Sequence, residues 1–396
     1  MSATALATPP AVQAAGGDVT IEVVTTPAGR RAFLDLPYRA YRDLPTWRAP
    51  LRLERSAQIS PKHNPALARM DHALMLARRG PEVVGRISAM VNPAHLAVHG
   101  DATGQFGFLD TLGPDPAAVA ALTAAAEDWL RARGMARITG PFNFSVNEEC
   151  GLLVEGFDSP PMLMMPHGRP DYAAALDGCG YAKAIDLYAF LHDFGETYSA
   201  PEKVQKWKAA FLRDPALSVR PLDMKNFTAD ITLVMDIFND AWSQNWGFVP
   251  FSADQISTMA QELKPLIRAD ALWIAMIRGE PAGFTLLLPD LNELTQGLDG
   301  RLLPFGWARL LWGLKVRGAR RARLPLAGLR RKFHKTRQGM LAMTGSCESA
   351  FAAQHARGIR QIEASWILET NRDLLNLVAL YDMPRYKTYR IFEKAL

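Results

Sequence analysis

The chain has 396 residues, of which 48% are hydrophobic and 21% are charged, with a formal net charge of +5. That length allows two domains with ordinary cores, and the composition excludes an intrinsically disordered protein. No apolar run reaches the ~20 residues that a membrane-spanning helix needs, which excludes a protein threaded through a bilayer.

The N-terminal segment, residues 1–18, is rich in Ala, Pro, Gly and Thr and contains no Lys or Arg. We expect a disordered tail there rather than a secretory signal, which favours a cytoplasmic protein. The three cysteines, Cys150, Cys179 and Cys347, lack the spacing of metal or redox motifs. They are expected to be core residues in a reducing compartment, with no metal site and no disulfide.

Four elements are predicted in the first half of the chain. Two apolar runs over residues 73–89, separated by a basic residue and a glycine, predict a β-hairpin. A helix is predicted over 116–133, because a glycine follows its last-turn arginine as in a helix C-cap. A strand over 137–144 follows, and residues 169–190 indicate a short helix, a turn and an aromatic strand.

The same elements recur in the same order about 200 residues later. The sequence predicts a hairpin over 271–287, a helix over 339–357, a strand over 359–367 and a final helix, turn and aromatic strand over 372–392. Three matched features in one order indicate an internal duplication.

Strands and helices in mixed order predict an α/β fold with two tandem domains. The expected boundaries are 19–196 and 219–396, joined by a linker helix in 197–218, where residues 203–212 are amphipathic. Two unrelated α/β domains with coinciding glycine caps are the alternative.

Basic residues crowd between Arg301 and Arg337, a stretch without Asp or Glu. It leads into the helix expected to begin near Gly339, and the unpaired N–H groups of a helix N-terminus attract anions. On charge alone, nucleic acid, anionic lipid and a phosphorylated cofactor all remain open. A solvated basic turn is the structural alternative.

The order of elements in residues 219–396 resembles the GCN5-related N-acyltransferase (GNAT) fold, in which each domain is a mixed, mostly antiparallel sheet flanked by helices. The resemblance implies acyl-CoA as co-substrate, with its pyrophosphate on the loop ahead of Gly339. That loop has one glycine where the family usually has two or more. The residues implied to contact CoA are Leu326, Gly328, Arg330, Arg331, Lys332, Lys335, Arg337, Gly339 and Asn371.

Tyr381 falls where the GNAT family has the tyrosine that protonates the leaving thiolate, and a buried core tyrosine is the alternative. The corresponding loop of the first half, residues 108–116, carries two aspartates and two prolines. Since aspartates repel a pyrophosphate, we expect the first half to shape the acceptor site instead of binding CoA.

Over nearly its whole length the chain also resembles a narrower bacterial family of tandem GNAT-like proteins that includes the bacterial ceramide synthases. These enzymes acylate the amine of a sphingoid base, so the resemblance implies a long-chain amino lipid, such as 3-oxosphinganine, as acceptor. It implies no nucleic-acid partner. The segments that carry it are residues 61–65 (PKHNP), 104–108 (GQFGF), 147–149 (NEE), 245–248 (NWGF), 303–307 (LPFGW) and 387–390 (KTYR).

Amide formation needs an uncharged amine, whereas an alkyl amine is almost wholly protonated at neutral pH. A general base is therefore useful. Glu148 and Glu149 follow the strand expected at 137–144, at the carboxyl edge where ligands of open α/β sheets gather. His167 is the next candidate, and Asp290 and Glu293 are further options. Helix-cap carboxylates and a turn histidine are the alternatives.

Residues 302–317 form an insertion that is apolar almost all round. Such a segment is a core helix, lines an acyl tunnel, or lies on a membrane with Arg317, Arg320, Arg321 and Arg323 against anionic headgroups. The last two uses favour a protein at the inner face of the inner membrane. The residues expected to bind the lipid are Phe305, Trp307 and Trp312, together with Asn245, Trp246 and Phe248.

Three functions are therefore compatible with the sequence. The first is N-acylation of a long-chain amino lipid, and the second is a non-catalytic lipid-binding role for a double fold that has lost CoA. The third is acyl transfer to a small amine or peptide. Nucleotide hydrolysis is disfavoured, because the chain has no P-loop motif.

Overall fold

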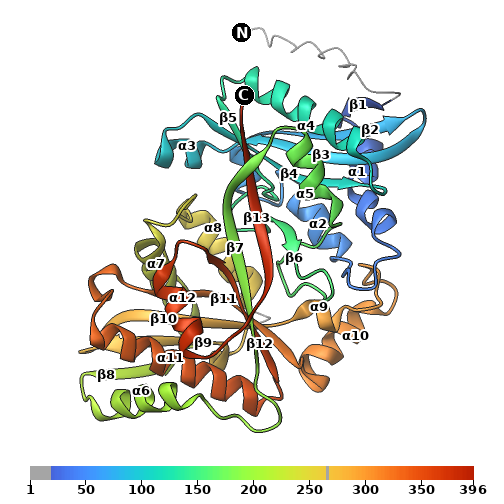
Figure 1. Ribbon diagram of the computed structural model, residues 1–396. Coiled ribbons are helices and arrows are strands. Elements are labelled where there is room, and N and C mark those ends of the chain that lie inside the picture. Colours follow the sequence, from blue (N-terminus) through green and yellow to red (C-terminus); the bar gives the residue numbers. More distant parts are fainter. Residues whose placement is uncertain (1–18, 265–266) are drawn as a thin grey trace.

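The structure, a computed structural model, describes residues 19–264 and 267–396, and the predicted disordered tail lies outside them (Figure 1). The first half contains β1 (Val19–Val23), α1 (Pro27–Ala40), α2 (Arg52–Gln58), β2 (Asp71–Arg79), β3 (Glu82–Val91), α3 (Pro93–His99), β4 (Thr103–Thr111), α4 (Pro116–Arg131), β5 (Arg137–Gly140), β6 (Leu152–Glu155), α5 (Asp171–Gly178) and β7 (Ala182–Asp193).

The second half begins with α6 (Glu202–Arg213), which lies where a linker helix is expected. It continues with β8 (Leu217–Pro221), α7 (Phe227–Trp242), α8 (Ala253–Leu263), β9 (Leu272–Ile277), β10 (Glu280–Pro289), α9 (Leu291–Leu294), α10 (Gly306–Trp312), β11 (Arg321–Leu329), α11 (Arg337–Ala356), β12 (Gln361–Leu368), α12 (Arg372–Leu380) and β13 (Arg385–Ala395).

The described strands join in one large sheet. Its order is β1-β2-β3-β4-β5-β13-β7-β12-β11-β10-β9-β8, and β6 pairs with β13 outside this path. Most neighbours are antiparallel, and the parallel pairs are β4 with β5 and β11 with β12. This mixed, mostly antiparallel sheet with flanking helices confirms the predicted fold class.

The repeated elements are confirmed, with one correction. Both predicted hairpins form, as β2 with β3 and β9 with β10, and the two long helices are α4 and α11. The strand predicted over residues 137–144 is too long, since β5 ends at Gly140. Pro141 follows, and proline has no N–H group to continue the strand ladder.

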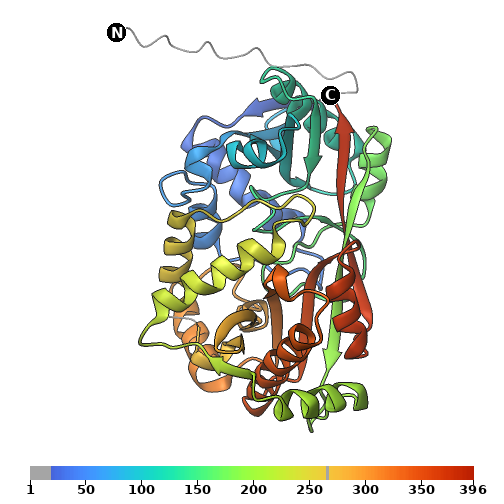
Figure 2. The same cartoon turned by 90° about the vertical axis from the view of Figure 1, so that its left-hand side faces the viewer.

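The two halves exchange their last strands. β13, from the end of the chain, lies between β5 and β7, while β7 lies between β13 and β12. Phe392 of β13 pairs with Gly140, and His192 of β7 pairs with Ile362. Figures 1 and 2 both show these two long strands side by side, crossing from one half to the other. The sheet is therefore continuous across the predicted boundary near residue 196.

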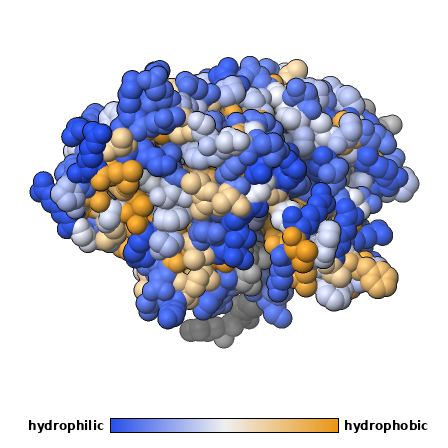
Figure 3. Space-filling view, turned by 90° about the horizontal axis from the view of Figure 1, so that it is seen from below, coloured by the Kyte–Doolittle hydropathy of each residue, from blue (hydrophilic) through white to orange (hydrophobic). Residues whose placement is uncertain are grey.

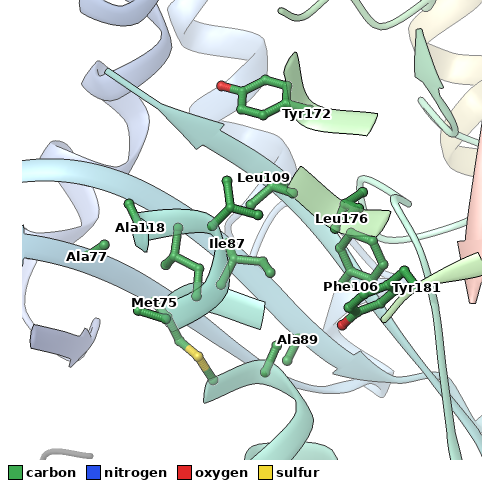
Figure 4. Packing of buried hydrophobic residues seen from close by; sticks show 14 of the residues in the cluster. Met75, Ala77, Ile87, Ala89, Phe106, Leu109, Ala118, Tyr172, Leu176 and Tyr181 are labelled. Carbon is green, nitrogen blue, oxygen red and sulfur yellow. The ribbon is translucent and has the colours of Figure 1, made fainter. Parts of the chain in front are cut away.

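Helices cover both faces of each half. In the first half, α4 and α5 pack on one face and α1 on the other. Figure 4 shows the α4 side, where Met75 and Ile87 of the strands lie near Ala118 of the helix, and Phe106 lies beside Tyr181. In the second half, α7 and α8 cover one face and α11 the other.

Each parallel pair separates before its strands end. The pairing of β4 with β5 stops at Gln105 and Thr139, although β4 runs on to Thr111. The pairing of β11 with β12 stops at Leu324 and Ala364, and β11 continues to Leu329. Each half thus has a gap between two strands at the same position, and a pocket lies at each gap.

Candidate active site

The pocket in the first half, called here the N-half pocket, has a volume of about 140 Å³. Its walls come from α1, the end of β4, the loop of residues 161–168 and α9 of the second half. The two halves are in direct contact beside this pocket, since the backbone N–H of Arg52 donates to the Gly300 carbonyl at 2.9 Å. Both halves of the chain therefore build this pocket.

The adjacent carboxylates Glu148 and Glu149 differ in their partners. Glu149 lines the N-half pocket, forms an ion pair with Arg55, and accepts a hydrogen bond from Asn143 Nδ2 at 2.8 Å. Glu148 accepts a hydrogen bond from Gln58 Nε2 at 2.6 Å. The pKa of Glu148 is raised to about 7, mainly by burial; the charge of Glu149 also raises it, whereas Gln58 and Arg55 lower it. A carboxylate with this pKa can accept a proton near neutral pH.

His167 lies on the wall of the same pocket. Its Nε2 atom is 3.0 Å from Thr46 Oγ1, and its Nδ1 atom is buried without a hydrogen-bond partner among the described residues. Burial lowers the pKa of His167 to about 4, and the charges of Lys387 and Arg48 act in the same direction. The ring is therefore neutral at pH 7 and is a weaker base than Glu148.

A buried polar network at the wall of the N-half pocket was not predicted from the sequence. Arg86 Nε donates to Asp110 Oδ2 at 2.7 Å, and the second carboxylate oxygen accepts from the Tyr41 hydroxyl. Tyr172 lies 3.1 Å from that hydroxyl, oxygen to oxygen. The sequence signal for this network was Arg86, a charged residue in the middle of the apolar strand β3. A buried arginine requires a partner, which predicts a polar network around it.

The pocket in the second half, called here the C-half pocket, is smaller, about 40 Å³, and apolar. It lies where β11 and β12 separate, and Phe351 of α11 and Tyr381, directly after α12, line it. The Tyr381 hydroxyl is buried without a hydrogen-bond partner among the described residues. Burial raises its pKa well above the usual value, and nearby Cys347 and Glu348 add to the effect. Tyr381 therefore keeps its proton at neutral pH.

The predicted catalytic residues thus line different pockets, Glu149 and His167 on one side and Tyr381 on the other. A buried arginine, Arg323, links the two. Its Nη1 atom donates to the Leu163 carbonyl of the N-half pocket at 2.9 Å, and its Nε atom donates to Ser365 Oγ of the C-half pocket at 2.8 Å.

The expectation that Arg321 and Arg323 face lipid headgroups is wrong. The Arg323 side chain is 5% exposed, and Arg321 is paired with the fully buried Asp290 at 2.5 Å. Leu163 contacts both groups, since its N–H donates to Asp290 Oδ1 at 3.0 Å and its carbonyl accepts from Arg323. Of the four arginines considered, Arg317 and Arg320 are exposed.

The other candidate bases are also engaged in structural contacts. Asp290 caps α9, and burial raises its pKa to about 6 in spite of Arg321. The Glu293 carboxylate accepts the backbone N–H groups of Arg320 and Arg321. Both carboxylates thus tie the start of β11 to α9.

Several cations of the predicted CoA loop contact carboxylates. The Arg330 side chain pairs with Asp236 at 2.6 Å, and Lys332 pairs with Glu280. The backbone N–H of Arg331 donates to Asp240 Oδ2 at 2.8 Å. Within the described part of the chain, Lys335 and Arg337 form no ion pair. The Arg331 guanidinium also forms no ion pair among the described residues, and its Nη1 atom is 3.5 Å from Ser243 Oγ. These three side chains therefore carry the positive charge that the loop still offers to a ligand.

The remaining predicted CoA residues have clear local roles. Thr336 caps α11 by accepting the N–H of Gly339 at 3.0 Å, and Asn371 caps α12 by accepting the N–H of Leu374 at 3.1 Å. Leu326 packs on the α7 side of the sheet. Gly328 has the Phe284 ring 2.9 Å from where a Cβ would lie, so a side chain would not fit there.

The loop with Asn245, Trp246 and Phe248 lies between the two halves. Phe248 is buried against α7, and Trp246 packs in a second cluster with Trp366. The Phe248 carbonyl is 3.0 Å from His99 Nε2 in the first half. These side chains are close to the C-half pocket through Trp366, which lines it.

The insertion that contains α10 exposes most of its large apolar side chains. Leu310 and Leu314 pack inward. The exposed side chains on the other face rule out a fully buried helix. Seen from below, the right-hand end of the molecule, where Figure 1 places α10, carries apolar residues among hydrophilic ones (Figure 3). The α10 patch consists of Leu303 (79% exposed), Phe305 (78%), Trp307 (50%), Leu311 (44%), Trp312 (55%) and Val316 (69%).

Within residues 19–264 and 267–396, no group of three or more His, Cys, Asp or Glu side chains is placed to hold a metal ion. No helix in that part of the chain combines the length and the apolar character needed to cross a bilayer.

Comparison with known sequences gives two full-length relatives. The chain is 41% identical over 381 residues to the bacterial ceramide synthase of Caulobacter vibrioides, covering 96% of this chain and 98% of that one. It is 38% identical over 372 residues to protein YghO of Escherichia coli, covering 92% and 93%. No family model matches the chain.

Solved structures agree with the fold. A tandem GNAT protein from the clavulanic acid biosynthesis pathway superposes with a TM-score of 0.54 at 13% identity, over 95% of this chain and 98% of that one. A GCN5-related N-acetyltransferase from Sphaerobacter thermophilus gives a TM-score of 0.51 at 12% identity, over 96% of each chain. The chain therefore has the tandem GNAT fold.

Proposed function

Since the chain belongs to the family of tandem GNAT-fold proteins that includes bacterial ceramide synthase, we propose that it is an acyl-CoA-dependent N-acyltransferase for long-chain amino lipids. The proposed acceptor is a sphingoid base such as 3-oxosphinganine. The observation that carries the proposal is the gap between β11 and β12, where the buried Tyr381 hydroxyl has no partner among the described residues.

In the proposed reaction the acceptor nitrogen attacks the thioester carbonyl carbon. The C–N bond forms, the C–S bond breaks, a proton leaves the nitrogen, and the thiolate of CoA takes up a proton. Deprotonation at pH 7 costs roughly 4 to 5 kcal/mol for an amine of pKa ~10.4, and about 1.4 kcal/mol for an α-amino group of pKa ~8. For the second kind of amine, Glu148 with a pKa of about 7 is a sufficient base.

We assign acyl-CoA to the second half. Support comes from the N-terminus of α11 with Lys335 and Arg337, which suits a pyrophosphate, and from the apolar C-half pocket. Tyr381 is the proposed acid for the thiolate, because its protonated hydroxyl lies at the C-half pocket without a partner among the described residues. Arg323, between the two pockets, is proposed to fix the geometry of Ser365 at the gap.

We also propose that the protein works at the cytoplasmic face of the inner membrane. Each large apolar side chain of the α10 patch that enters the interface contributes about 1.5 to 3 kcal/mol, and each nearby arginine adds about 1 kcal/mol on an anionic surface. Trp307, Leu311 and Trp312 with Arg317 are sufficient for peripheral binding by this reckoning.

The membrane proposal predicts that Trp307→Ser with Leu311→Ser and Trp312→Ser reduces sedimentation with anionic vesicles at least tenfold. Because these side chains are exposed, the melting temperature should stay within ~2 °C of the parent. Leu212→Ser, on the exposed face of α6, is the matched control. Equal vesicle binding by the triple variant and the parent would refute the membrane role of α10.

The enzymatic proposal is tested by incubating the purified protein with long-chain acyl-CoA and sphingoid bases and identifying products by mass spectrometry. An N-acyl product is expected. Absence of any amide, together with no rise in melting temperature at saturating acyl-CoA, would favour the non-catalytic lipid-binding role. Product from acetyl-CoA and a small amine, without vesicle binding, would favour the third function.

A further inference from the structure

The N-half pocket contains two paired cations and one that is not paired. Arg55 pairs with Glu149, and Arg86 pairs with Asp110. Arg48, on the same pocket wall, forms no ion pair within the described residues. Its Nη1 atom donates to the carbonyls of Pro45 and Trp47 at 2.8 and 3.0 Å, whereas its Nε atom is buried without a partner there.

The second buried atom without a partner in this pocket is Nδ1 of His167. Burial of a polar atom without a hydrogen bond costs free energy, so both positions favour a ligand that supplies polar atoms. Burial also lowers the pKa of Arg48, and the charge of Arg321 lowers it further. The guanidinium stays charged and will donate to an oxygen atom of a ligand.

The same pocket also offers a partner for the amino group of a ligand. The Glu149 carboxylate lies on the wall beside Arg55, and Glu148 is the adjacent residue. The pocket thus offers a carboxylate for a nitrogen and an arginine N–H for an oxygen. A ligand with an amino group next to a hydroxyl or keto group matches both.

An apolar route leads out of the pocket. Leu163 and Met165 line it, and Met164 between them is 39% exposed. On the other side Leu291 of α9 completes the wall. The buried Leu294 of α9 packs against Gly313, which directly follows α10, so α9 connects the pocket wall to the segment that carries the α10 patch.

We propose that the N-half pocket binds the head of a long-chain amino alcohol or amino ketone, with Arg48 Nε donating to its oxygen. The aliphatic chain leaves over Met164 and α9 toward the α10 patch. The assignment rests on the proposed function, and it makes Arg48 the residue that selects oxygenated acceptors over plain amines.

The test compares a short-chain sphinganine with a plain alkylamine of the same length, in the absence of acyl-CoA. Binding is measured by tryptophan fluorescence for the parent and for Arg48→Met. Loss of a charged hydrogen bond should weaken sphinganine binding roughly tenfold or more, while the alkylamine changes less than about twofold. Equal weakening of both ligands, or of neither, would overturn the role of Arg48.

A second variant tests the route of the chain. Met164→Asp places a charge on that route and should weaken both ligands about tenfold, whereas Met224→Asp, at an equally exposed methionine (36%), should leave both unchanged. Met164 has a positive φ of 60°, a conformation that aspartate tolerates, so folding should be preserved. Unchanged binding by Met164→Asp would place the chain elsewhere.

Turnover is measured in a separate assay. The results can then refute the enzymatic proposal without refuting the pocket assignment, and the reverse. If the parent binds sphinganine with this Arg48 dependence but forms no amide, the pocket assignment stands and the enzymatic proposal fails. If amide forms and neither Arg48→Met nor Met164→Asp changes Kd or KM for the acceptor, the enzymatic proposal stands and the pocket assignment fails.

Discussion

Glu148 and Glu149 are neighbours in the chain with different electrostatic surroundings. Glu149 is held by Arg55, whereas Glu148 has the neutral amide of Gln58 as its partner. The motif of two acids was visible in the sequence. The division of roles was not, because Arg55 and Gln58 lie about 90 residues away and reach the acids only through the fold.

The raised pKa of Glu148 predicts a pH profile. If its deprotonated form is the base, kcat/KM should rise about tenfold per pH unit below pH 7 and level off above it. Glu148→Gln should reduce the rate about 100-fold or more at pH 7 and remove that inflection. Stopped-assay rates between pH 5.5 and 8.5 measure both, and an inflection near pH 7 that persists in Glu148→Gln would assign it to another group.

Tyr381→Phe should lower kcat about 100-fold while the KM for acyl-CoA stays within about twofold. The hydroxyl is buried without a partner among the described residues, so its removal should leave the melting temperature unchanged or slightly higher. Steady-state kinetics and thermal unfolding test the two statements. A normal kcat would leave Tyr381 as a core residue only.

At the scale of elements, the sequence predicted what is locally encoded. Both hairpins and both long helices were visible because glycine and proline mark their ends. The length of β5 was overestimated. One of the alternatives for the insertion placed Arg323 against lipid headgroups, because its partners Ser365 and Leu163 come from distant segments. Side-chain pairing between such segments is set by tertiary structure and leaves no local pattern.

The cations at the start of α11 should contribute unequally to acyl-CoA binding, because some of them already pair with carboxylates. Lys335→Glu with Arg337→Glu should raise the Kd for acyl-CoA about tenfold at low salt, and less at high salt because of screening. Arg330→Gln should change Kd less than about threefold, since Arg330 already pairs with Asp236. Calorimetric titration measures these values, with Arg213→Glu, at the end of α6, as control.

Unchanged acyl-CoA binding by the Lys335 and Arg337 double variant would remove this loop from the CoA site. A larger effect at Arg330 than at the double variant would show that the Asp236 pair opens for the ligand.

At the scale of the whole molecule, strand exchange joins the two cores. The internal duplication could be read from the sequence, but the exchange could not, since β7 and β13 would satisfy the same pattern within either half. Pairing partners of similar strands are decided by the packing of both halves together, and the resulting sheet is continuous.

One cooperative unfolding transition is therefore expected. Phe392→Ala, in the exchanged strand β13 and fully buried in the core of the first half, should lower the melting temperature of that single transition by removing about 3 to 5 kcal/mol. Val316→Ala, at an exposed site, should not. Differential scanning calorimetry tests this expectation. Two transitions, of which Phe392→Ala shifts only one, would show that the halves unfold independently.

The long separation between β13 and the first half along the chain has a consequence for biosynthesis. About 190 residues separate Asp193 from Arg385, so at ~5 to 20 residues per second the ribosome needs roughly 10 to 40 s between the two strands. During that time β5 and β6 lack their neighbour. The nascent first half must therefore wait with an open sheet edge until β13 has been synthesised, which makes it a client for chaperones that shield unpaired strands.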